Sequence, residues 1–109
     1  MKNEKAVDEM TSCPIHKTLE LFQGKWNTWI LFELSKKKSM RFGELKKAIP
    51  EISNTMLAST LKNLEVKELI NRMQFNEIPP HVEYSSTVAA KELQPIFDAM
   101  YAWGEKHIK

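Results

Sequence analysis

The sequence has little of what several common protein classes need: its 109 residues include one cysteine and three glycines. A single cysteine excludes an intramolecular disulfide, and so few glycines leave no glycine-rich phosphate loop. No apolar run approaches the length that spans a bilayer, and the opening MKNEKAVDEMTS lacks the apolar segment of a signal peptide. We therefore expect a cytoplasmic protein without membrane contact, whose residues 1–12 form a flexible N-terminal arm.

The residues of common catalytic and metal sites are also sparse. The three histidines, His16, His81 and His107, fall in three separate predicted elements. Only Cys13 and His16 have a ligand-like spacing, and two ligands do not make a zinc site. No Ser-His-Asp or Cys-His-Asp set is apparent, so we expect no enzyme activity, no bound metal and no cofactor.

Length and composition favour one small globular domain. A chain of 109 residues, 42% of them apolar and 28% charged, suffices for one hydrophobic core. The net charge is only +2, but residues 13–50 carry eight lysines and arginines against three glutamates. This local excess could contact nucleic-acid phosphates, although a solvated loop would explain Lys36, Lys37 and Lys38 equally well.

Residues 42–69 have the pattern of two short helices joined by a tight turn. Apolar residues recur at helical spacing over 42–49, a break follows at 50–52, and Ser53 occupies the N-cap position of the second helix. The buried face of this second helix is expected to hold Met56 or Leu57, together with Leu61 and Leu64. Its outer face is short and polar, which suits a DNA major groove, and consists of Asn54, Thr55, Ala58, Ser59, Lys62 and Asn63. A helix-turn-helix and an ordinary helical hairpin both fit this stretch when it is taken alone.

The flanking segments favour the helix-turn-helix. Two helices are expected before it, over 13–24 and 25–34, the second largely apolar, and a very short strand at Met40–Arg41. After it, residues 70–76 and 81–86 alternate as strands around a Pro79–Pro80 turn. Helices followed by a β-hairpin make a winged helix, so the predicted fold is mainly α, with a small β component (α+β).

The last predicted helix begins at Thr87, a suitable N-cap, and Pro95 should kink or split it. It carries more large apolar residues than so small a domain could cover by itself, and such a surface commonly marks an interface. The simplest way to bury this surface is a two-fold dimer, in which the first helix could also take part. The residues expected at this dimer interface are Leu19, Phe22, Ile96, Phe97, Met100, Tyr101 and Trp103. The alternative is that the helix folds back over the core of its own chain.

Four sequence segments resemble the HxlR-type transcriptional regulators, winged-helix proteins related to the MarR group. They are Cys13-Pro14-Ile15, Gly24-Lys25-Trp26, Arg41-Phe42-Gly43-Glu44-Leu45 and Pro79-Pro80-His81-Val82-Glu83-Tyr84-Ser85. The resemblance covers 13–104 and implies one domain over 13–109, with a helix-turn-helix at 42–69, a wing at 70–86 and a dimerisation helix at 87–109. It also implies a homodimer that binds operator DNA in the cytoplasm, and we expect a repressor.

The DNA contacts expected from the residues and the resemblance together lie on the reading helix, on the basic segments before it and on the wing. They are Lys36, Lys37, Lys38, Arg41, Lys46, Lys47, Ser53, Asn54, Thr55, Ser59, Lys62, Asn63, Arg72 and His81. The chain departs from the family pattern at Thr55, Ser59 and Thr60, where longer and often charged residues are common. It departs again at His81, where arginine or lysine is typical.

The signal that such a regulator answers is open at the level of sequence. The resemblance implies that Cys13 is a redox or electrophile sensor, and a thiolate at a helix N-cap would be favoured by the helix dipole. Cys13 could equally be a plain cap residue. A small aromatic effector held by Trp29, Phe22, Tyr101 or Trp103 is a second possibility, although each of these also suits the core. A third is a winged helix that binds protein instead of DNA.

Overall fold

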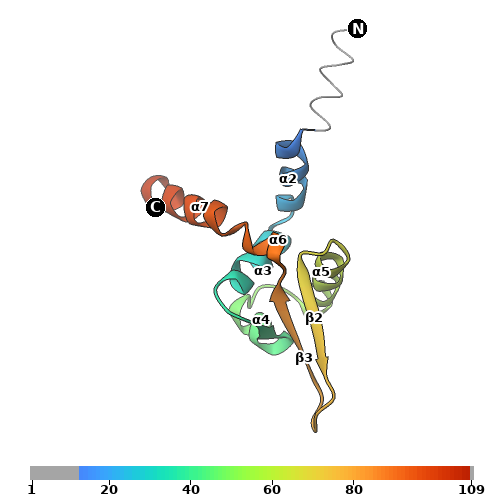
Figure 1. The fold of residues 1–109 in the computed structure, drawn as a ribbon. Helices are drawn as coiled ribbons and strands as arrows, with labels where there is room; N and C mark the ends of the chain where they lie inside the picture. The colour runs from blue at the N-terminus through green and yellow to red at the C-terminus, as the bar shows by residue number, and fades with distance from the viewer. Residues whose placement is uncertain (1–12, 109) are drawn as a thin grey trace.

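The computed structural model describes residues 13–108. The arm expected at 1–12 lies outside the described residues. In chain order the helices and strands are α2 (Pro14–Phe22), α3 (Lys25–Ser35), β1 (Met40–Arg41), α4 (Phe42–Ala48), α5 (Asn54–Val66), β2 (Ile70–Phe75), β3 (His81–Ser86), α6 (Val88–Lys91) and α7 (Gln94–His107). Helices followed by a hairpin are the predicted winged-helix order, which is confirmed (Figure 1).

One hydrophobic core holds α3, α4 and α5 against the sheet. Its buried members are Ile30, Leu31, Leu34, Met40, Leu45, Ile49, Ile52, Leu57, Leu61, Leu64, Ile70, Ala90, Leu93 and Phe97. At the first buried position of α5 the expectation of Met56 or Leu57 resolves to Leu57, while Met56 is exposed. Thr60 is buried too and therefore does not lie on the outer face of α5.

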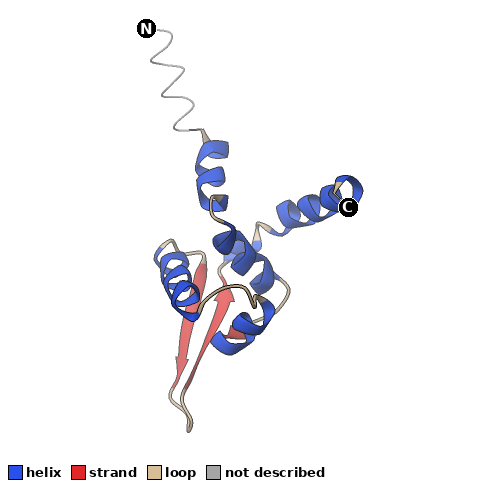
Figure 2. Ribbon diagram, turned by 180° about the vertical axis from the view of Figure 1, so that it is seen from behind, coloured by secondary structure: helices blue, strands red, loops and turns tan. Residues whose placement is uncertain are grey.

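The wing is an antiparallel hairpin whose register runs from Ile70 opposite Ser86 to Phe75 opposite His81. The short strand β1 pairs with the other edge of β3, so the strand order is β1-β3-β2. The hairpin extends beyond the helices to its tip at Pro79–Pro80, where Figure 2 shows no helix beside it. Side chains near the tip are therefore free to meet a partner.

Two helix starts are fixed by the predicted caps. The Ser53 hydroxyl accepts a hydrogen bond from the Met56 backbone N–H at 3.0 Å, and the Thr87 hydroxyl accepts one from Ala90 at 3.3 Å. Pro95 lies in the first turn of α7, so the predicted break of the last helix is confirmed as a division into α6 and α7.

Helices α2 and α7 project from the body on the side away from the wing tip (Figure 1). No residue of α2 is buried, and Phe97 is the one buried residue of α7. Between residues 13 and 108 no helix is both long enough and apolar enough to cross a membrane.

Candidate nucleic-acid interface

The outer face of α5 is exposed and polar. Asn54, Thr55, Ser59, Lys62 and Asn63 all lie on the surface, as the sequence predicts. They face outward because Leu57, Leu61 and Leu64 occupy the opposite side of the helix and pack into the core. The cap at Ser53 begins this helix, so a buried apolar face and a sequence-encoded cap together present a groove-sized polar surface.

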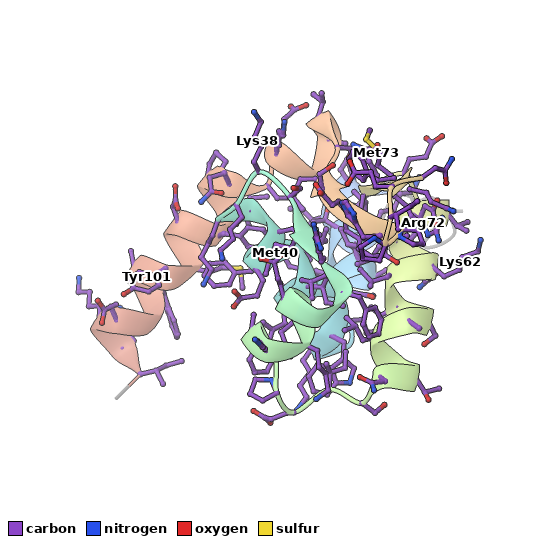
Figure 3. All side chains as sticks on the ribbon, turned by 90° about the horizontal axis from the view of Figure 1, so that it is seen from below. Lys38, Met40, Lys62, Arg72, Met73 and Tyr101 are labelled. Carbon is purple, nitrogen blue, oxygen red and sulfur yellow. The ribbon has the colours of Figure 1, made fainter. Side chains whose placement is uncertain are left out.

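A groove of about 300 Å³ separates α5 from the hairpin, and Ala58, Lys62, Glu65, Arg72 and Tyr84 line it. Figure 3 shows Lys62 and Arg72 near each other at this place, one from the helix and one from the wing. Within residues 13–108, neither cation has a carboxylate oxygen within 4.0 Å. Both charges are therefore available to phosphates.

The basic loop at Lys36–Lys38 lies away from the groove between α5 and the wing. Figure 3 shows Lys38 on a different side of the molecule from Lys62 and Arg72. Lys36 is already engaged, because its ammonium lies 3.1 Å from a Glu33 oxygen and 4.7 Å from the centre of the Phe32 ring. The structure thus does not join this loop to the patch on α5 and the wing, and its phosphate contacts stay a prediction.

The cations of α4 adjoin the turn of the helix-turn-helix. Arg41 is the N-cap of α4, and its backbone N–H donates to the Glu44 carboxylate at 2.8 Å. At the other end, the Lys46 ammonium donates to the Pro50 carbonyl at 3.0 Å and so closes the turn. Lys47 is exposed. Lys47 therefore has its side chain available, whereas Lys46 first serves the turn and Arg41 lies opposite Glu83 in the sheet.

His81, which the sequence predicts as a wing contact to DNA, is mostly buried by its neighbours in the wing. Its side chain is only 14% exposed. The ring stacks on Phe75, with 4.7 Å between centroids and 14° between planes. Its Nε2 lies 3.0 Å from Glu83 Oε2 and its Nδ1 3.8 Å from Glu77 Oε2. The two carboxylates flank opposite nitrogens of the ring, and no cluster suited to a metal ion occurs in the described part of the chain.

Glu83 is the functional candidate that sequence reasoning missed. Its Oε1 accepts a hydrogen bond from the Ser39 hydroxyl at 2.8 Å, while Oε2 faces His81. These two hydrogen bonds, with the charges of His81 and Arg41, lower the pKa of the Glu83 carboxyl below its usual value despite partial burial. The available signal was the spacing His81-x-Glu83, which places both side chains on one face of a strand.

The projecting helices carry the apolar surface that the sequence predicts. Leu19 is 57% exposed and Trp103 59%, and Ile96, Met100 and Tyr101 are exposed as well. Phe97 differs from its expected place at the interface. It is 3% exposed, stacks on Phe22 at 6.3 Å and meets Phe32 edge-on at 5.8 Å, because the first turn of α7 still covers the core. Phe22 is half-buried: it stacks on Phe97 of the core but belongs to the projecting helix α2.

An apolar groove of about 370 Å³ lies where α2, α3 and α7 meet. Its lining residues are Phe22, Lys25, Thr28, Trp29, Phe32 and Met100. Phe22 and Trp29 belong to the aromatics suggested for an effector, whereas Tyr101 and Trp103 do not line this groove. The Thr28 hydroxyl is buried there without a hydrogen-bond partner among the described residues.

Cys13 occupies the N-cap of α2, as predicted, and is half-buried. Its side chain makes no capping hydrogen bond. The thiol thus lies at the N-terminal end of α2, which is the end farthest from the body (Figure 1).

A capped helix with a polar outer face, a preceding short helix and a three-stranded wing together define a winged helix-turn-helix protein, a class that reads DNA. Residues 21–109 match the HxlR-like helix-turn-helix family, and the chain belongs to that family. It is thus a transcriptional regulator of the helix-turn-helix type and not an enzyme.

Three relatives illustrate the kinship. YdzF of Bacillus subtilis (strain 168), an uncharacterized HTH-type transcriptional regulator, is 44% identical over 91 residues, which are 84% of each chain. A crystal structure from Porphyromonas gingivalis W83, described as a MarR-family regulator, is 41% identical, with a TM-score of 0.83 and coverage of 89% of this chain and 94% of that one. The oxidized form of the redox regulator HypR is 33% identical, with a TM-score of 0.80 and coverage of 89% and 99%.

Proposed function

We propose that this protein is a homodimeric, cytoplasmic repressor that binds operator DNA through α5 and the wing. The observation that carries the proposal is the groove between them, where Lys62 and Arg72 lie together and neither has a carboxylate oxygen within 4.0 Å among the described residues, although Glu65 also lines the groove. The polar outer face of α5 would read base edges, while the two cations and the cations of α4 would contact phosphates. A dimer through α2 and α7 would place two reading helices about one DNA turn apart, roughly 34–36 Å.

The test is a gel-shift titration with the DNA upstream of the protein's own gene and of the adjacent gene, against a scrambled duplex of equal length. We expect a shift of the upstream DNA at concentrations that leave the scrambled duplex free. Affinity should fall steeply with salt, since phosphate contacts release counterions. The absence of any sequence-specific shift would refute the repressor and favour a winged helix that binds protein.

We further propose that Cys13 transmits an oxidant or electrophile signal. The support is its position at the outer end of α2, one of the two helices proposed to pair, and the 33% identity to HypR, which is named a redox regulator. As the chain has one cysteine, oxidation would join two Cys13 thiols of different chains, or Cys13 and a small thiol, with two electrons passing to the oxidant. Diamide should then release DNA from the natural protein but not from a Cys13→Ser variant. Equal release from both would leave Cys13 as a structural cap.

A small aromatic effector is the second candidate signal, and the groove beside Trp29 favours it. Phe22, Phe32 and Met100 supply an apolar lining, and Lys25 supplies a cation for an acidic group. Benzoate is a suitable probe. It should quench tryptophan fluorescence saturably in the natural protein and less in a Phe32→Ala variant. Quenching that does not saturate would exclude this ligand class.

A further inference from the structure

We propose that Glu83 is a positioning residue for DNA binding, because its carboxylate ties the wing to the segment that leads into α4. The proposal rests on the proposed DNA-binding function. Each oxygen of the carboxylate meets a different part of the fold. Oε1 accepts a hydrogen bond of 2.8 Å from the hydroxyl of Ser39, which lies 44 positions earlier in the chain. Oε2 lies 3.0 Å from His81 Nε2 in the wing.

The bridge matters because the backbone pairing at this edge of the sheet is short. Strand β1 contains two residues and pairs with β3 only through Met40 opposite Tyr84 and Arg41 opposite Glu83. Arg41 is also the N-cap of α4. A shift of β1 would therefore move the first helix of the helix-turn-helix relative to the wing. The Ser39–Glu83 hydrogen bond extends this short pairing by a side-chain contact.

The other end of the bridge reaches toward the wing tip. His81 is held by its stack on Phe75 and faces the Glu77 carboxylate at 3.8 Å, in the turn between the strands. Glu77, His81, Glu83 and Ser39 thus form one continuous row of polar contacts from the hairpin turn to the residue before β1. This row fixes the angle at which the wing leaves the body.

Glu83 acts through position and not through contact with DNA. Arg72 pairs with Tyr84, the strand neighbour of Glu83, so successive side chains place Arg72 and Glu83 on opposite faces of the sheet. A carboxylate near phosphates also opposes DNA binding by its charge. Loss of the charge and loss of the bridge should therefore change DNA affinity in opposite directions, which makes the two roles separable.

Three variants separate these effects: Glu83→Gln, Glu83→Ala and Ser39→Ala. Both changes at Glu83 remove the same charge, but glutamine can still accept from Ser39 and donate to the unprotonated nitrogen of a neutral His81. At pH 8 we expect Glu83→Gln to bind upstream DNA at least as tightly as the natural protein. Glu83→Ala should bind about fivefold more weakly than Glu83→Gln, and Ser39→Ala about threefold more weakly than the natural protein, as expected for lost hydrogen bonds. Equal binding by all four proteins would overturn the proposal.

A measurement without DNA keeps this test apart from the test of operator binding. Backbone hydrogen exchange should become faster in both β3 and the first turn of α4 in Ser39→Ala, while α7 keeps its natural rates. If the natural protein shifted no DNA but this paired change appeared, DNA binding would fail and the bridge would stand as a wing-to-helix tie. Unchanged exchange in both segments would overturn the bridge itself, whatever the DNA result. Because Ser39→Ala removes one hydroxyl, it decides the matter even if Glu83→Ala does not fold.

Discussion

Lys62 is the single lysine or arginine between Asn54 and Val66, so the charge of α5 depends on one side chain. Arg72 of the wing is the other cation that lines the same groove. The positive charge that this groove would present to DNA is therefore small and divided between α5 and the wing. Individual cations should matter more here than on a uniformly basic surface.

Lys62→Ala should weaken binding to operator and to scrambled DNA by similar factors. We expect the slope of log affinity against log salt to fall by about one, because one phosphate contact is lost. Lys38→Ala is the matched control, since Lys38 lies away from this patch (Figure 3). If Lys38→Ala reduced the slope as much as Lys62→Ala did, the basic loop would be part of the interface after all.

Glu83 makes stability depend on acid pH. Its pKa is lower in the folded protein than in the unfolded chain, so the unfolded chain takes up the proton first as pH falls. The contribution of ionised Glu83 to the free energy of unfolding is complete above the ordinary pKa of glutamate. It is lost as pH falls through the lower pKa of the folded protein. Between pH 6 and pH 3, the midpoint temperature of thermal unfolding should fall less steeply for Ser39→Ala than for the natural protein. Parallel curves would show that the Ser39 hydrogen bond does not shift this pKa.

At the scale of elements, α5 owes its start to one hydroxyl. Ser53 stands outside the helix and accepts from the Met56 N–H, which would otherwise lack a partner in the first turn. The wing is joined to the body by a two-residue β1 and by side chains. Reading helix and wing are thus positioned by separate devices, and each can be perturbed without the other.

Ser53→Ala should lower the free energy of unfolding by about 1 kcal/mol, the usual cost of a lost N-cap. Ser53→Asp keeps an acceptor at the same place and should retain stability, since a negative charge also suits a helix N-terminus. The same aspartate should weaken DNA binding, because it places a carboxylate beside the groove-reading face. Chemical denaturation and gel shift distinguish the two effects, and equal stability of all three proteins would show that the cap is dispensable.

At the scale of the whole molecule, the two projecting helices leave large apolar side chains in water. Leu19, Tyr101 and Trp103 are each more than half exposed, and a second copy of the chain is the proposed cover. The body that would bind DNA and the surface that would pair thus lie at opposite ends (Figure 1). The dimer would set the distance between two reading helices.

Leu19→Asp should therefore convert the dimer to a monomer in sedimentation or light scattering at micromolar concentration, since a buried charge without a partner disfavours the interface. Operator binding should fall with it, because one half-site remains per molecule. Val66→Asp is the control, as Val66 is a similarly exposed apolar residue (69%) on α5. Monomers from both variants, or dimers from both, would contradict the assignment of the interface to α2 and α7.

The sequence by itself determined the elements and their order, because these depend on neighbours along the chain. Hydroxyls at Ser53 and Thr87, proline at Pro95 and strand alternation around Pro79–Pro80 are local signals, and each marks a boundary that the structure has. The exposed face of α5 followed from the same periodicity. Local rules thus sufficed for the winged-helix class.

Tertiary structure alone decided which side chains meet. Phe97 belongs to the core because α7 begins over Phe22 and Phe32, a placement that helical spacing cannot give. Lys38 and Lys62 are both cationic but lie on different sides of the molecule (Figure 3). His81 contacts Glu83, which in turn accepts a hydrogen bond from Ser39, 44 residues earlier. Such contacts join residues distant in sequence, and the packing of the whole chain fixes them.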